Sequence, residues 1–227
     1  MAPIHEAVIR SEVFLVDDIT KGNPAQLESR LDQYIGLDNA EGSTPLILAA
    51  RVENDHILRV LLERGANTNA YDDARKTALW YAARSGNSGI IFLLINQATD
   101  VNLSTPLTVA TMQGHEEAVG LLLRHGGANI NAQNEQGKTA IYEACAFGRT
   151  RIFRTLIEAG GDISITDHHG MTPLMAAAQH GLLAMMKLLI KQRDGGRNGI
   201  LHINAKDSKG RTALYHTCCQ SKIQLTR

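Results

Sequence analysis

Cysteine is scarce in this chain of 227 residues: there are three, Cys145, Cys218 and Cys219, and the last two are adjacent. This number and spacing argue against a framework of disulfides or a set of metal ligands. They favour free thiols that pack as small apolar residues in a reducing compartment.

The chain also lacks net charge, because 23 lysine and arginine residues balance 23 aspartate and glutamate residues. A balanced charge gives no overall attraction to nucleic acid or to an anionic membrane, so we expect neither partner. No apolar run approaches the roughly 18 residues of a membrane-spanning helix, and residues 1–10 lack the pattern of a signal peptide. We therefore expect an intracellular protein in the cytoplasm, with the nucleus or a host cytosol left open.

Catalytic motifs are missing as well. The sequence has no G-x-x-x-x-G-K-[ST] phosphate loop and no G-x-S-x-G nucleophile elbow. His115-Glu116-Glu117 resembles the start of a zinc-protease helix, but Val119 stands where that motif needs its second histidine. The adjacent pair His168-His169 has no Cys or His partner at ligand spacing. We expect no catalytic, cofactor-binding or metal-binding residues.

What the sequence does contain is a recurring phrase of threonine, then proline or alanine, then leucine or isoleucine. Subtracting the threonine numbers gives intervals of 33, 28, 34, 33 and 40 residues. The six copies are Thr44-Pro45-Leu46, Thr77-Ala78-Leu79, Thr105-Pro106-Leu107, Thr139-Ala140-Ile141, Thr172-Pro173-Leu174 and Thr212-Ala213-Leu214.

A period near 33 that carries a T-P-L-x-x-A core resembles the ankyrin-repeat family over most of the chain. The resemblance implies an all-α repeat solenoid in which each repeat is a turn, or finger, followed by two helices. Threonine suits the helix N-cap, and the proline that follows it suits the first helical position, where no amide bond is lost. Most of the first helices are expected to end at a glycine, namely Gly86, Gly114, Gly148 and Gly181.

The resemblance also sets the expected boundaries. Residues 1–38 are expected to form an N-terminal helical capping repeat, and residues 39–227 the array. The array divides into five full repeats and a truncated sixth. Their expected bounds are 39–71, 72–102, 103–133, 134–166, 167–206 and 207–227.

Three irregularities interrupt the array. About five finger residues are missing before Thr105, so we expect a short or absent finger there. Residues 191–200 are rich in glycine and charge and are expected to form a solvent loop, either a neutral spacer or a partner contact. The sixth repeat stops at Arg227, where its second helix should form, so either that helix is degenerate or the chain continues.

In the family, the inner helices and the finger tips form a concave face that holds another protein. By position, the resemblance places partner-binding residues on that face. They are Arg51, Lys76, Arg84, Met112, Gln113, Lys138, Phe147, His168, His169, Met171, Gln179, His180, Lys209 and Arg211.

Two aromatic features stand out, because aromatic residues make up only 4% of the chain. Phe147, with Met112 and Met171 in the flanking repeats, is expected to anchor a partner, although a phenylalanine folded onto its own helix is the alternative. Trp80 replaces a residue that faces the core in the family, so we expect packing to be its main role.

The leading hypothesis is therefore a non-enzymatic, monomeric scaffold that binds a protein or peptide through its concave face. The alternative is the targeting region of a larger protein, such as a pathogen effector or an enzyme, with its activity C-terminal of this chain. A purely structural spacer is a third reading.

Overall fold

The computed structural model describes residues 42–97, 99–102, 105–125, 127–192 and 201–225. The expected cap at residues 1–38 and most of the expected loop at 191–200 lie outside these residues. Within them the chain forms eleven helices, and its only β pairing is an isolated antiparallel bridge between Tyr71 and Thr77. This confirms the expected all-α repeat fold. Two compact units, Met1–Pro106 and Leu107–Arg227, make up the chain.

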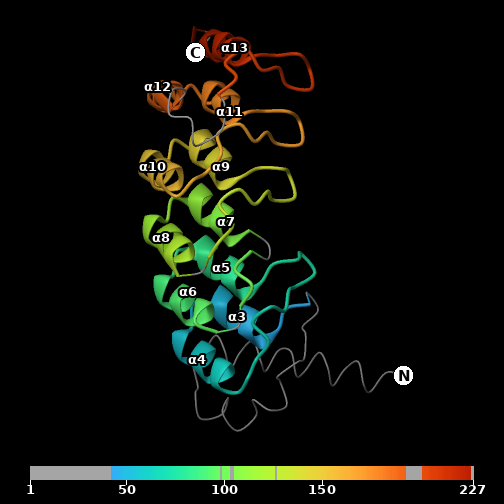
Figure 1. Ribbon diagram of the computed structural model, residues 1–227. Helices are drawn as coiled ribbons and strands as arrows, with labels where there is room; N and C mark the ends of the chain where they lie inside the picture. Colours follow the sequence, from blue (N-terminus) through green and yellow to red (C-terminus); the bar gives the residue numbers. More distant parts are fainter. Residues whose placement is uncertain (1–41, 98, 103–104, 126, 193–200, 226–227) are drawn as a thin grey trace, which may run out of the picture. The chain divides into compact units, whose positions relative to one another are not determined.

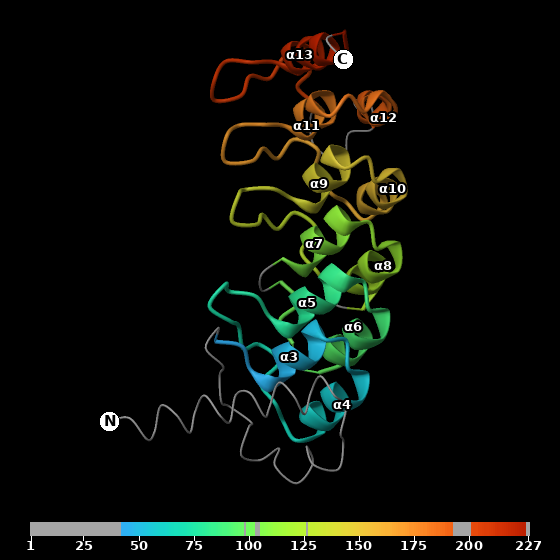
Figure 2. The same cartoon turned by 180° about the vertical axis from the view of Figure 1, so that it is seen from behind.

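Each unit is built from helix pairs in two layers (Figures 1 and 2). In the first unit the inner helices, which lie beside the fingers, are α3 (Pro45–Arg51) and α5 (Ala78–Ser85), and the outer helices are α4 (Asp55–Glu63) and α6 (Ser88–Ile95). In the second unit the inner helices are α7 (Pro106–Gln113), α9 (Ala140–Ala146), α11 (Pro173–Gln179) and α13 (Ala213–Leu225). Its outer helices are α8 (Glu116–Arg124), α10 (Thr150–Glu158) and α12 (Leu183–Gln192).

Five of the recurring threonines cap their inner helices, as the sequence predicts. The hydroxyl of Thr77 accepts a hydrogen bond from the amide of Trp80 at 3.2 Å, and Thr139 does the same for Tyr142 at 3.2 Å. Thr44, Thr172 and Thr212 repeat the bond at 3.4, 3.2 and 3.4 Å. Each bond satisfies an amide that has no partner inside the first turn of its helix.

Of the six described inner helices, the five that precede α13 end in a break with a left-handed backbone. Gly86, Gly114, Gly148 and Gly181 have φ values of 78°, 92°, 65° and 67°, which glycine adopts without steric cost. Glu53 takes the same position in the first described repeat with φ of 58°. The sixth repeat has Ser221 there instead, and α13 continues through it to Leu225.

Each described finger is locked by the first residue of its turn. In the finger that begins at Asp167, the Asp167 amide donates to the Met171 carbonyl at 3.0 Å, and its carboxylate accepts from the Met171 amide at 2.9 Å. The fingers that begin at Asp72, Asn134 and Asp207 repeat both bonds. The side-chain oxygen therefore accepts a hydrogen bond that a neighbouring strand would otherwise accept, so these turns are held without a regular β-ladder.

Only Leu103, Ser104 and Thr105 separate Asn102 from the start of α7. The first two lie outside the described residues, so the missing third finger stays a prediction.

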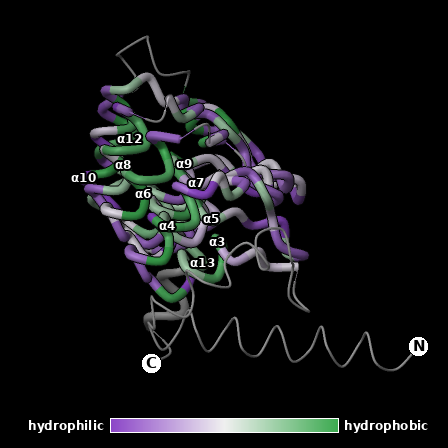
Figure 3. The backbone as a smooth tube through the Cα atoms, turned by 90° about the horizontal axis from the view of Figure 1, so that it is seen from below, coloured by the Kyte–Doolittle hydropathy of each residue, from purple (hydrophilic) through white to green (hydrophobic). Residues whose placement is uncertain are grey.

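The core of each unit lies between the two helix layers. Small side chains on the inner helices are fully buried, and they allow neighbouring inner helices to pack directly, α3 on α5 and α9 on α11. These side chains are Ala49, Ala50, Ala82, Ala83, Ala144, Cys145, Ala177 and Ala178. Figure 3 shows many hydrophobic residues along the helices, whereas hydrophilic residues are common in the segments outside them.

The outer helices complete the core with large apolar side chains, and Leu122 of α8 is one of them. It is 0% exposed, so Leu122→Ala removes buried surface and leaves a cavity. We expect the free energy of unfolding, measured by urea denaturation, to fall by about 2–5 kcal/mol. The matched control is Leu183→Ala, because Leu183 on α12 is 61% exposed; it should change stability by less than about 0.5 kcal/mol. Equal losses for the two variants would contradict the assignment of Leu122 to the core.

Candidate functional site

The inner helices and fingers of each unit leave polar and aromatic side chains on the surface that the fingers flank. We call this surface the finger-side face and describe it separately for each unit. It is the face to which the sequence assigns the partner-binding residues.

In the second unit the exposed aromatic residue next to an inner helix is Phe147, which follows the last residue of α9. Its side chain is 49% exposed, although its backbone is fixed by a bond from its amide to the Glu143 carbonyl at 3.0 Å. His180 follows α11 at the same position of the next repeat. The two rings are stacked with centroids 6.5 Å apart and planes 21° apart. An exposed aromatic pair on rigid helix ends presents apolar surface to a partner at little entropic cost.

Phe147 therefore lies on the surface, as expected, but its neighbour is His180. The expected contribution of Met171 is wrong, because Met171 is only 6% exposed. Lys138 and Arg211 at equivalent positions make the same backbone bonds but keep their charged ends partly exposed, whereas the Met171 side chain has no charge and is buried. Met112 is half-buried, and its carbonyl accepts two hydrogen bonds from the Arg149 guanidinium at 3.1 and 3.3 Å.

The remaining expected residues of the second unit divide by exposure. Two cations are half-buried and take part in contacts within the chain: Lys138 lies 3.9 Å from Glu143, and Arg211 binds Asp207 at 2.8 Å. The exposed residues are Gln113, His168, His169, Gln179 and Lys209. His168 and His169 lie in one finger, whose backbone binds the fingers on both sides through His168 N to Gln136 O at 3.1 Å and Ser208 N to His169 O at 2.9 Å.

In the first unit the finger-side face is centred on Trp80. Sequence reasoning expected this ring mainly to pack in the core, but it is only half-buried. The Lys76 ammonium lies 5.4 Å from its ring centroid and the Arg84 guanidinium 5.6 Å from it. Both distances are within the range of cation–π attraction. The spacing of Lys76, Trp80 and Arg84, four residues apart, was the signal in the sequence that could have revealed this arrangement.

Tyr81 extends this group toward α3. Its ring meets that of Trp80 edge-on at 5.1 Å, and the exposed Arg51 guanidinium lies 5.4 Å from its centroid. The Tyr81 hydroxyl donates to the Asp72 carboxylate at 2.6 Å. All three cations that the sequence assigned to this unit, Arg51, Lys76 and Arg84, therefore lie against the rings of two adjacent aromatic residues.

Beneath the face of the second unit lies a buried acid on α9. Glu143 is 4% exposed, and burial raises the pKa of its carboxyl, although the Lys138 ammonium acts in the opposite direction. The neighbouring Tyr142 is also buried, and burial, together with the charge and hydrogen bond of Asp167, raises the pKa of its hydroxyl. Burial alone raises the pKa of the Cys145 thiol, which makes it a poor nucleophile.

Another buried acid, Asp207, holds the last finger against α13. Its carboxylate binds Arg211 at 2.8 Å and His216 at 3.2 Å. Burial raises the pKa of Asp207, but hydrogen bonds from Arg211, Lys209 and His216 outweigh it and hold this pKa below its usual range. Arg211 and His216 thus support the fold, which explains why Arg211 is not fully available to a partner.

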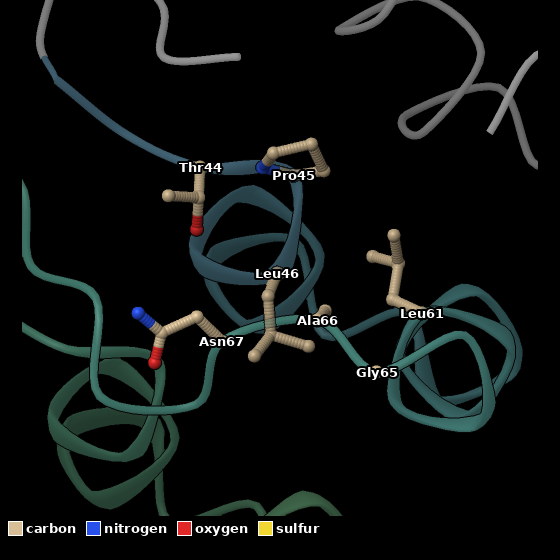
Figure 4. A pocket seen from close by; sticks show the side chains of 7 residues that line it. All are labelled: Thr44, Pro45, Leu46, Leu61, Gly65, Ala66 and Asn67. Carbon is tan, nitrogen blue, oxygen red and sulfur yellow. The ribbon is translucent and has the colours of Figure 1, made fainter. Parts of the chain in front are cut away.

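A cavity of about 170 Å³ lies between α3 and the end of α4 (Figure 4). Its lining is mainly apolar and consists of Thr44, Pro45, Leu46, Leu61, Gly65, Ala66 and Asn67. The Thr44 hydroxyl already caps α3, so the cavity offers little chemistry for catalysis. Among the described residues, no group of three or more His, Cys, Asp or Glu residues is placed to hold a metal ion. No helix in the same residues is long and apolar enough to cross a membrane.

Glu143→Gln tests the electrostatics beneath the face. Because the folded state raises the pKa of this carboxyl, the folded chain binds more protons than the unfolded chain over the range between the ordinary and the raised pKa. The stability of the wild type must therefore fall, relative to the glutamine variant, as pH rises through that range. We expect urea denaturation to show that the stability of Glu143→Gln relative to the wild type is greater at pH 8 than at pH 4. The exposed Glu158→Gln should show no such gain, and a shift in the opposite direction for Glu143→Gln would contradict the raised pKa.

Comparison with known proteins agrees with this geometry. A family model for ankyrin repeats, in three copies, matches residues 4–104, 93–167 and 159–226. Inversin from Canis lupus familiaris is 31% identical over 226 residues, which are 97% of this chain and 20% of that protein. The ankyrin repeat and KH domain-containing protein mask-1 of Caenorhabditis elegans is 30% identical over 155 residues, which are 65% of this chain and 6% of that protein.

Among solved structures, the crystal structure of the ankyrin repeat domain of Bcl-3, described as a unique member of the IkappaB protein family, superposes with a TM-score of 0.73. It is 22% identical, and the match covers 89% of this chain and 92% of that one. This likeness supports the fold. The chain spans only about a fifth of the length of inversin and less of mask-1. The family model, the relatives and the capped helix pairs lead to one conclusion: this chain belongs to the ankyrin-repeat family.

Proposed function

We propose that this chain is a non-enzymatic scaffold that binds a protein or peptide through its finger-side face. Ankyrin repeats generally mediate protein–protein interaction, and they are typically not enzymes. The observation that supports this face most directly is the stacked pair of Phe147 and His180, with Phe147 49% exposed.

Physical reasoning favours this pair as the anchor. Phe147 is held by its position at the end of α9, so a partner that covers the ring removes apolar surface from water without ordering a mobile side chain. Aromatic residues in rigid settings dominate many binding interfaces. Gln179 precedes His180 in the chain and is exposed, and the exposed His168 and His169 lie on a finger of the same unit, so polar groups accompany the apolar ring. An apolar centre with a polar rim is the usual composition of a protein interface.

A second candidate function uses the same face within a larger protein. The chain covers 20% of inversin and 6% of mask-1, so its relatives carry these repeats as one part of a longer chain. In this proposal the repeats recruit a target for an activity located elsewhere, C-terminal of this chain. The two candidates share their binding surface and differ in what is attached to it.

The proposal places the protein inside the cell, in the cytoplasm, and acting as a monomer. In the described residues Cys145, Cys218 and Cys219 are free thiols, which suits a reducing compartment.

Phe147→Ala tests the proposed anchor. With the purified chain as bait in a cell extract, we expect the amount of bound partner to fall about tenfold or more, as for loss of a central aromatic anchor. The melting temperature should change little, because the ring is half-exposed and the helix end is held by the backbone.

Phe92→Ala is the matched control, since Phe92 is 48% exposed but lies on the outer helix α6. It should retain the partner. Equal capture by both variants would contradict the proposed face, and a large loss of stability for Phe147→Ala would show that Phe147 serves the fold.

A further inference from the structure

The finger-side face of the first unit carries a group of side chains that differs from the Phe147 pair in its chemistry. We call Arg51, Lys76, Trp80, Tyr81 and Arg84 the Trp80 cluster. It combines three cations with two adjacent aromatic rings, and every cation lies within 5.6 Å of a ring centroid. Arg51 and Arg84 are exposed, and Lys76 and Trp80 are half-buried.

One acid, Asp72, contacts this group through hydrogen bonds. Asp72 is only 5% exposed. Its carboxylate accepts hydrogen bonds from the Tyr81 hydroxyl at 2.6 Å and from the Lys76 amide at 2.8 Å. Asp73, which follows it, is the exposed acid of the same finger. The three cations also make other contacts within the chain, so what they offer a ligand is their charge and their exposed donors.

We propose that the Trp80 cluster is a docking surface for an acidic, extended segment of another protein. Two carboxylates of such a segment would meet the Lys76 ammonium and the Arg84 guanidinium, and the residue between them would lie near the edge of the Trp80 ring. Charge-assisted bonds from an arginine to a carboxylate are stronger than neutral ones. This inference rests on the proposed function, because it names the chemistry of a partner for the finger-side face.

The distances set the spacing of the acidic residues in that segment. Since the Lys76 ammonium and the Arg84 guanidinium each lie within 5.6 Å of the Trp80 centroid, they are at most about 11 Å apart. An extended chain rises about 3.3 Å per residue. Side chains on one face of an extended segment recur at every second residue, so the two carboxylates should be two residues apart, as in Glu-x-Glu.

Single-stranded nucleic acid is the competing ligand, because it too binds cations interleaved with aromatic rings. Two observations disfavour it. The chain has no net charge, and the cluster offers three cations, whereas nucleic-acid sites usually neutralise a longer run of phosphates. An acidic peptide needs only two or three charge contacts.

Trp80 makes the test direct, since it is the only tryptophan in the chain. Tryptophan fluorescence of the chain would be followed while a peptide of four Glu-Ser repeats is added. We expect saturable binding that changes the emission of Trp80 and weakens as salt is raised. Peptides in which each Glu is replaced by Gln or by Lys should not bind, and neither should a short oligo-dT.

Variants then assign the contacts. By fluorescence anisotropy of a labelled peptide, Lys76→Gln and Arg84→Gln should each weaken binding about threefold, as for loss of an exposed ion pair. Trp80→Ala should weaken it about tenfold or more. The matched control is Lys187→Gln, which removes one exposed positive charge on α12 and should leave the affinity unchanged. If Trp80→Ala impairs folding, as judged by circular dichroism, the affinities of Lys76→Gln and Arg84→Gln decide whether the Trp80 cluster binds the peptide.

The outcomes separate this inference from the proposed function. Phe147→Ala should bind the acidic peptide like the wild type, since Phe147 belongs to the other unit. Equal binding of the Glu and Gln peptides, no binding at all, or stronger binding of oligo-dT would overturn the acidic-segment proposal. None of these results would affect capture of a partner through Phe147.

Discussion

The close approach of neighbouring inner helices is the constraint on which the rest of the structure depends. It requires side chains no larger than alanine or cysteine where α3 meets α5 and where α9 meets α11, and these side chains are fully buried. Within a tightly packed layer, a larger residue at these positions would force the helices apart and disturb their other contacts. Small residues therefore fix the spacing between repeats, and the spacing fixes which surface side chains become neighbours.

The candidate binding residues follow from that spacing. Phe147 and His180 stack because equivalent positions of adjacent repeats are brought together. The Tyr81 ring lies within reach of the Arg51 guanidinium because α3 and α5 of adjacent repeats pack directly. The fingers add to this order through backbone bonds from one finger to the next, such as His168 to Gln136. A scaffold of repeated units thus arranges a non-repeating set of exposed side chains, which is where specificity for a partner can reside.

Much of the fold was predictable from the sequence because its signals are local. The Thr N-caps and the glycines with positive φ each act within one repeat, and the structure confirms them at the positions where they are described. The candidate site was harder to predict because exposure depends on size and on neighbours. Met171 was expected on the surface, but its uncharged side chain is only 6% exposed, whereas Lys138 and Arg211 at equivalent positions are half-buried. Trp80 was expected in the core, where Ile47 and Met175 at equivalent positions are buried with 1% exposure. The larger indole ring of Trp80 is only half-buried, and Lys76 and Arg84 lie beside it.

Site-specific photo-crosslinking tests the central claim most directly, namely that partners bind on the finger-side face. A photoreactive phenylalanine analogue would be placed at position 147 in one preparation and at position 92 in another. The two positions have nearly equal exposure, 49% and 48%, but lie on inner and outer layers. The account predicts a discrete crosslinked product from position 147 and none from position 92. A product from position 92 alone would show that the outer helices bind the partner and would contradict the account.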